Sequence, residues 1–167
     1  MQRRAFLSLS ATAAALSLSG CGFALRKAPD FAFTKLYTNM AGSTLGVELR
    51  RSLQSTRKVE VITDARRISE AEVILDVLSD QREKVVLSTN AAGQVREFQL
   101  RLRFRFRLRT LAGKELIPDS EILQQRDISF NESAVLAKEA EENLLYRDMQ
   151  NDIVQQIMRR LAAVTEL

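Results

Sequence analysis

The run from residue 98 to residue 109 constrains the fold of this chain most strongly, because apolar side chains alternate there with arginines. Even-numbered positions are apolar, and most odd-numbered positions are basic. A repeat of two is the repeat of a β-strand, and it places the two sets on opposite faces of a sheet. The apolar set comprises Phe98, Leu100, Leu102, Phe104, Phe106 and Leu108, and the basic set comprises Arg101, Arg103, Arg105, Arg107 and Arg109.

Other segments predict the strands and turns around this one. β-Branched and aromatic residues mark strands, and glycine within a polar cluster marks a tight turn. We expect turns at 90–93 and 112–114, where Gly93 can take a positive φ. The expected further strands are 31–38, 59–61, 73–87 and 122–130.

Two segments predict amphipathic helices that can cover the apolar face. Leu45, Leu49 and Leu53 recur every four residues after a possible cap at Ser43 or Thr44. A longer helix follows a possible cap at Asn131 or Ser133. Its apolar stripe is Leu145, Met149, Ile153, Ile157 and Leu161.

The arginine stripe has two interpretations. In the first, acids on a neighbouring strand balance a solvated face. If Thr89 faces Gln94 across the turn, the register pairs Arg107 with Asp76, Arg103 with Asp80 and Arg101 with Arg82. That register leaves Arg101, Arg105 and Arg109 without an opposed acid. In the second interpretation, the stripe meets an anionic ligand or an enclosing partner, since guanidinium groups bind phosphate in a bidentate manner.

Composition narrows the classes of function. The 167 residues are 46% hydrophobic and 28% charged, which suits one globular domain, expected over residues 31–167. With no histidine and one cysteine, His-dependent catalysis, His-ligated zinc and multi-cysteine metal sites are excluded. The acidic pair Glu141–Glu142 is expected on a solvated helix face. We expect no enzyme, no metal and no cofactor.

The first 21 residues are similar to a bacterial lipoprotein leader. Arg3 and Arg4 precede an uncharged apolar run too short for a permanent membrane span. Residues 18–21, Leu-Ser-Gly-Cys, resemble a lipobox, which implies cleavage after residue 20 and lipidation of Cys21. Several acyl chains, palmitate among them, would anchor the protein stably. Residues 21–30 form a tether, and the export route, Sec or twin-arginine, stays open.

The predicted anchor also indicates a compartment. Gly22 stands where an aspartate would retain a lipoprotein in the inner membrane, so the resemblance implies the periplasmic side of the outer membrane. A protein in that place does not meet nucleic acid. The abundant phosphate-bearing anion there is lipopolysaccharide.

The chain resembles the lipopolysaccharide-assembly lipoprotein family LptE. The resemblance starts at Cys-Gly-Phe-Ala-Leu-Arg over residues 21–26, where Ala24 replaces the histidine of the family. It continues at 93–94 and 97–100. It is strongest at Ala-Val-Leu-Ala-Lys-Glu over residues 134–139 and along the helix through 157–161.

The resemblance implies a non-enzymatic partner of the outer-membrane β-barrel LptD. It implies a plug inside that barrel, a role in barrel assembly and binding of lipopolysaccharide on its way to the cell surface. The implied fold is α+β, a two-layer sandwich of two helices packed on one face of a four-stranded mixed sheet.

The resemblance also suggests residues that contact lipopolysaccharide. Lys138 stands at the lysine of the family's Leu-Ala-Lys stretch, which is implicated in that contact, although a solvated lysine at a helix start explains it equally. The basic residue that the family has near the hairpin tip is replaced here by Ala91 and Ala92. Residues that could substitute for it are Arg96 and the stripe arginines Arg101, Arg103 and Arg105.

Two other functions stay open. The first is a free-standing periplasmic lipoprotein that carries or chaperones an anionic lipid or glycolipid, which would require an internal apolar cavity. The second is a hydrolase, for which the sequence offers no serine with a neighbouring base.

Overall fold

The computed structural model describes residues 29–40 and 42–167, which form an α+β fold with one mixed sheet. The predicted leader, Cys21 and most of the tether lie outside the described residues. The elements are β1 Lys35–Thr38, α2 Thr44–Ser55, β2 Glu60–Ile62, the 3-10 helix η2 Ala65–Glu70, β3 Val73–Thr89, β4 Val95–Thr110, β5 Glu115–Ser129, the 3-10 helix η3 Glu132–Ala134 and α3 Val135–Ala162.

The sheet has five strands in the order β2-β1-β3-β4-β5. Strands β1, β2 and β3 are parallel to one another, whereas β3, β4 and β5 form an antiparallel meander. The mixed sheet is confirmed. The residue patterns predicted all five strands, but the four strands and two helices that the family resemblance implied were wrong in number. Both short parallel strands join the sheet, because α2 crosses over between them and returns the chain to the same edge. The described residues also form η2 and η3 besides α2 and α3.

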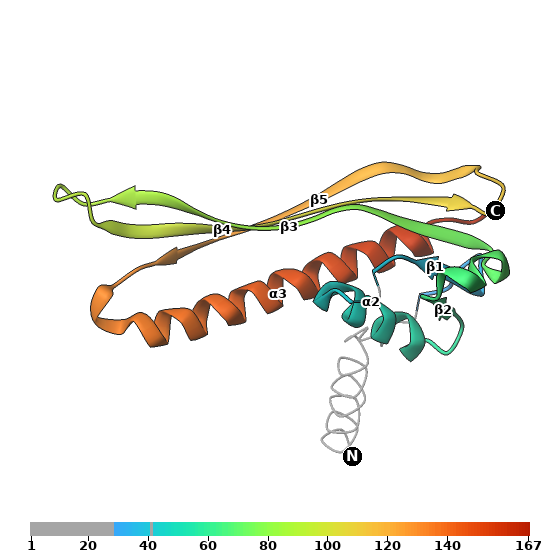
Figure 1. Ribbon diagram of the computed structural model, residues 1–167, viewed down its shortest axis with the longest axis horizontal. Helices are drawn as coiled ribbons and strands as arrows, with labels where there is room; N and C mark the ends of the chain where they lie inside the picture. Colours follow the sequence, from blue (N-terminus) through green and yellow to red (C-terminus); the bar gives the residue numbers. More distant parts are fainter. Residues whose placement is uncertain (1–28, 41) are drawn as a thin grey trace, which may run out of the picture.

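The long strands and the helices form two layers. In Figure 1, β3, β4 and β5 run along most of the molecule, α3 runs below them, and α2 lies near the end that holds β1 and β2. The even-numbered residues of β4 face the helices as predicted, and Leu100, Phe104 and Phe106 are completely buried. They pack in one core with residues of α3 such as Met149 and Ile157.

The two helix predictions were largely correct. Ser43 caps α2 by accepting a hydrogen bond from the Gly46 amide at 2.9 Å, and the three leucines of the stripe are buried. In α3 the predicted stripe is buried from Met149 onward, but Tyr146 is buried where Leu145 was expected and Leu145 only partly packs against the core. Asn131 caps η3 rather than α3.

The starts of two strands differ most from the predictions. β1 begins at Lys35, four residues later than expected, and β5 begins at Glu115, seven residues earlier than expected. Pro118 interrupts the strand pattern, so the sequence did not predict residues 115–121 as part of β5. Because β5 is an edge strand, proline is tolerated there. Both predicted turns are present, with φ values of 78° at Gly93 and 93° at Gly113.

The register between β3 and β4 was predicted correctly only up to Val77. Asp76 pairs with Arg107, as expected, but a bulge at Leu78 then shifts the pairing by one residue. Arg103 therefore faces Gln81 instead of Asp80. Likewise, Arg101 faces Glu83 instead of Arg82. A bulge adds one unpaired residue and leaves no strong signal in a single sequence.

Candidate functional site

A groove of about 250 Å³ lies between the first turns of α3 and the half of the long strands that is farther from β1 and β2. Its floor and walls are largely apolar, with two lysines and two glutamates among the residues that line it. The lining residues are Lys84, Phe98, Ile128, Ser129, Phe130, Val135, Lys138, Glu139 and Glu142. An apolar hollow with basic groups can bind an amphiphile that carries negative charge.

Lys138, the residue suggested by the family resemblance, lines this groove. Its ammonium group donates hydrogen bonds to the Ser129 hydroxyl at 3.0 Å and to the Glu141 carboxylate at 2.8 Å. Its side chain is 21% exposed. Lys138 is therefore held in place on the groove wall instead of extending freely into solvent, as a solvated helix-start lysine would.

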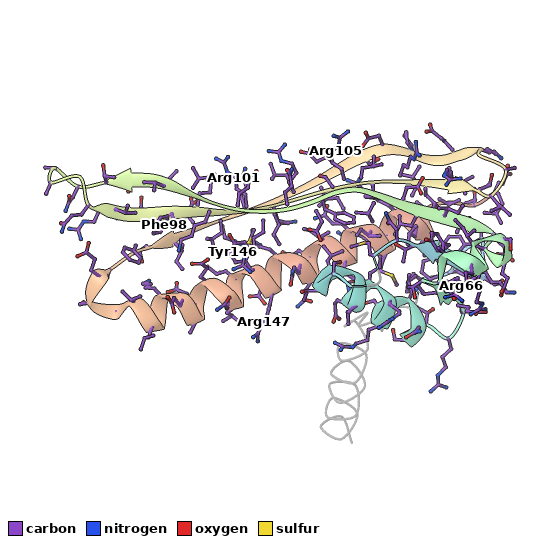
Figure 2. The ribbon with its side chains drawn as sticks, in the orientation of Figure 1. Arg66, Phe98, Arg101, Arg105, Tyr146 and Arg147 are labelled. Carbon is purple, nitrogen blue, oxygen red and sulfur yellow. The ribbon has the colours of Figure 1, made fainter. Side chains whose placement is uncertain are left out.

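A cluster of charged and aromatic groups adjoins Lys138. The Lys84 ammonium lies 4.3 Å above the Phe98 ring and 2.6 Å from the Glu142 carboxylate. The Arg82 guanidinium lies 3.6 Å from Glu142 and 3.6 Å above the Tyr146 ring. Figure 2 shows Phe98 and Tyr146 between the sheet and α3. Cations placed over aromatic faces in this way gain electrostatic attraction from the ring.

The bulge at Leu78 creates this cluster. After the extra residue, the even-numbered side chains of β3 are paired with the buried residues of β4, so Arg82 and Lys84 face α3. Sequence reasoning missed both residues, because unbroken alternation would have placed them on the opposite face.

Arg96 is exposed and lies at the same end of the molecule. It lines a second hollow of about 190 Å³ with Asn90, Gln94 and Glu132, among others. Phe130 lines both hollows, so they adjoin. Two of the five predicted lipopolysaccharide contacts, Arg96 and Lys138, are thus brought to one region.

The other three, Arg101, Arg103 and Arg105, lie on the opposite face of the sheet. Figure 2 shows Arg101 and Arg105 pointing away from the helices. Each has a hydrogen-bond acceptor on that face. Arg101 donates to Gln99 at 2.7 Å, Arg103 donates to Glu121 at 3.4 Å, and Arg105 donates to Asp119.

Asp76 accepts hydrogen bonds from both remaining arginines of the stripe, from Arg107 at 2.9 Å and from Arg109 at 2.8 Å. Burial of Asp76 opposes ionisation, but the hydrogen bonds from Arg109 and Arg107 outweigh it, so the pKa of Asp76 lies below its ordinary value. The expectation that Arg101, Arg105 and Arg109 lack an opposed acid was therefore wrong. Arg101 faces Glu83 on β3 because of the bulge, and β5 places Glu121 opposite Arg105 and Glu115 opposite Arg109.

Two further observations concern the described part of the chain. Within residues 29–40 and 42–167, no three His, Cys, Asp or Glu side chains are arranged to share a metal ion. Of the helices that these ranges contain, none is both long and apolar enough to cross a membrane.

Comparisons with known proteins identify the family. The model of the LptE family, described as lipopolysaccharide-assembly, matches residues 30–161. Among curated proteins, no match is found. An NMR structure of an uncharacterized lipoprotein B from Nitrosomonas europaea is 39% identical, with a TM-score of 0.70, over 86% of this chain and 92% of that one.

Two crystal structures share the fold at lower identity. A rare lipoprotein B from Shewanella oneidensis is 22% identical, with a TM-score of 0.63, over 78% of this chain and 93% of that one. A minor lipoprotein from Acinetobacter baumannii is 21% identical, with a TM-score of 0.62, over 80% of this chain and 94% of that one. Since the family model spans most of the sequence, this chain belongs to the LptE family of lipopolysaccharide-assembly lipoproteins.

Proposed function

We propose that this protein is a non-enzymatic outer-membrane lipoprotein that partners an LptD-like β-barrel as a plug, assists its assembly and binds lipopolysaccharide. The observation that carries the proposal is the family match over residues 30–161. A cleaved leader and lipidation of Cys21 belong to the same proposal. They would hold the domain on the periplasmic side of the outer membrane.

The two faces of the sheet suggest two roles. We assign lipopolysaccharide contact to the groove, where an apolar wall lies beside Lys138 and close to Arg96. A lipid A phosphate is an acceptor for such cations, and acyl chains suit apolar walls. We assign the opposite face to the barrel, because barrel interiors are polar and the stripe offers Arg101, Arg103 and Arg105 in ion pairs and hydrogen bonds.

This groove alone is too small to serve a free-standing lipid carrier. At about 250 Å³ it is smaller than the pockets of about 300–1,000 Å³ that enclose drug-sized ligands. A carrier must bury several acyl chains of a lipid A. The groove can hold part of such a molecule during a transfer that a partner completes.

Purification of the lipidated protein from outer membranes tests the partnership. We expect a large β-barrel protein to co-purify in mild detergent. Mass spectrometry of the same sample should find an acylated Cys21 as the first residue. A protein that purifies without a barrel, or with its leader intact and its thiol free, contradicts the proposal.

Binding of purified lipopolysaccharide at one fixed salt concentration tests the groove. Each charge-assisted hydrogen bond contributes roughly 1.5–3 kcal/mol, so the double variant Lys138→Ala, Arg96→Ala should bind at least about tenfold more weakly. The double variant Arg101→Gln, Arg103→Gln is the matched control, because it removes two positive charges from the opposite face. Equal loss in the control would indicate non-specific attraction, and unchanged binding by the double variant would rule out the groove.

A further inference from the structure

On the side that faces away from β4, the edge of β3 is paired along its first residues and unpaired along the rest. β1 pairs with β3 only from Val73 to Leu75. Next to it, the side-chain amide of Asn39 accepts a hydrogen bond from the Val77 N–H at 3.2 Å and donates one to the Val77 carbonyl at 3.5 Å. From Ser79 to Thr89, no strand of the described residues pairs with this edge.

The register identifies the backbone groups that face the open edge. The bonds to Asn39 show that the N–H and C=O of Val77 point away from β4. Because the bulge adds one unpaired residue at Leu78, Ser79 bonds to β4 and alternation resumes from there. The residues that present N–H and C=O groups to the open edge are Asp80, Arg82, Lys84 and Val86.

Side chains along this edge favour pairing with another chain. Val85, Val86 and Leu87 are 39%, 49% and 47% exposed. The side chains of Arg82 and Lys84 remain 52% and 37% exposed even though both lie near Glu142. An incoming strand with carboxylates opposite the two cations and apolar groups beside the valines would complement this edge.

The edge of β5, at the other end of the sheet, has the opposite character. It contains Pro118, which lacks an N–H, and the acids Asp119, Glu121 and Asp127. Proline and charges on an edge strand prevent pairing with other strands. Residues 80–86 of β3 contain two acids, two cations and no proline, whereas β5 contains four acids and one arginine. Of the two long edges that the described residues form, that of β3 therefore suits an acidic strand better.

We propose that residues 80–86 of β3 accept an extended, acidic segment of the β-barrel partner as an added strand of the sheet. Strand addition uses backbone hydrogen bonds for affinity and alternate side chains for specificity. This inference rests on the proposed function, since the barrel supplies the segment. A second copy of this chain is a poorer occupant, because antiparallel self-pairing about Glu83 opposes Arg82 of one copy to Lys84 of the other.

Residue-resolved hydrogen exchange tests the proposal on the intact protein, free and bound to its barrel. In the free protein, the amides of Arg82, Lys84 and Val86 should exchange quickly. In the complex, they should slow by at least about tenfold, because each gains a backbone hydrogen bond. Glu83 is the internal reference, since its amide bonds to β4 in both states. The amide of Gln125 serves as the matched control on the edge of β5.

The outcomes separate this inference from the function on which it rests. If the complex forms and the three amides exchange as fast as in the free protein, strand addition is wrong while the partnership stands. If the wild-type protein binds no barrel, both fail. Protection that rises with concentration of the free protein would show self-pairing and would also overturn the inference.

Edge-proline variants give a second readout. Lys84→Pro removes an edge-facing N–H without removing a bond to β4, and should reduce the co-purified barrel by about tenfold. Lys84→Gln keeps the N–H and should lose less. Gln125→Pro makes the equivalent change on the other edge and should leave the barrel yield unchanged. Equal losses for Lys84→Pro and Gln125→Pro would contradict the proposal. If Lys84→Pro does not fold, the hydrogen-exchange experiment alone tests strand addition.

Discussion

At the scale of single residues, Asp76 decides how two arginines of the stripe are accommodated. Its carboxylate accepts hydrogen bonds from Arg107 and Arg109, and its side chain is only 23% exposed. Asp119 contacts Arg105 at a more exposed position, where the two side chains are each 46% exposed. Solvent screens the second pair more strongly, so the two carboxylates should differ in their contribution to stability.

Asp76→Asn should lower the free energy of unfolding by roughly 1–3 kcal/mol, because two charge-assisted hydrogen bonds are weakened in a partly buried place. Asp119→Asn is the matched control and should cost less than about 1 kcal/mol. Urea denaturation followed by circular dichroism measures both. A loss for Asp119→Asn as large as that for Asp76→Asn would contradict the assignment.

The stability contributed by Asp76 should also depend on pH. Its folded-state pKa is lowered below the value in the unfolded chain, which is about 3.9. The contribution is therefore fully present above about pH 4 and is lost as the pH falls through the folded pKa. The difference in unfolding free energy between wild type and Asp76→Asn should shrink below about pH 4. A constant difference down to pH 2 would exclude this linkage.

At the scale of elements, the bulge at Leu78 determines which side chains of β3 after residue 78 face α3. Val77 pairs with Phe106 and Ser79 with Arg105, so Leu78 is an extra residue between consecutive pairs. Leu78 is 43% exposed. The bulge places Arg82 and Lys84 on the helix side without costing the core a buried side chain.

Deletion of Leu78 should therefore leave the fold intact. Val77 and Ser79 would become adjacent in a regular ladder, and the later pairs, such as Glu83 with Arg101, would keep their register. Deletion of Gln99 in regular β4 should instead unfold the protein, because it moves one part of the apolar face toward solvent. Thermal unfolding compares the two variants. A Leu78 deletion as damaging as the Gln99 deletion would mean that the bulge is itself required for folding.

At the scale of the whole molecule, Glu142 of α3 links this helix to the hairpin of β3 and β4. It lies within ion-pair distance of Arg82 and Lys84 on β3, and its side chain is 17% exposed. Tyr146, one turn further along α3, donates a hydrogen bond to the Glu83 carbonyl at 2.7 Å. These contacts hold α3 against the strands beside the groove (Figure 1).

Glu142→Gln should loosen this end of the molecule, because two cations near aromatic rings lose their carboxylate. We expect faster hydrogen exchange at the amides of Gln81, Glu83 and Val85, which bond to β4, with a local loss of roughly 1–3 kcal/mol. Glu139→Gln is the matched control, since it lines the same groove from the same helix. Exchange that increases equally in both variants, or in neither, would show that Glu142 does not hold the hairpin.

Local pattern in the sequence determined most of the elements. Alternation in β4 predicted its two faces, leucines four residues apart predicted α2, and the glycines at 93 and 113 predicted both hairpin turns. These features depend on side chains only a few residues apart, so a single sequence contains them. The family resemblance depended on short motifs of the same kind, and the match over residues 30–161 confirmed it.

Apart from the predicted pair of Asp76 and Arg107, the tertiary structure decided which side chains meet. The bulge at Leu78 turned Arg82 and Lys84 toward α3, and the placement of β5 beside β4 supplied Asp119 and Glu121 to the arginine stripe. The groove depends on the way α3 returns beneath β4 and β5, which brings Lys138 beside Ser129 and near Phe98. Contacts of this kind follow from strand order and register, which are set by packing of the whole chain and have no local signature.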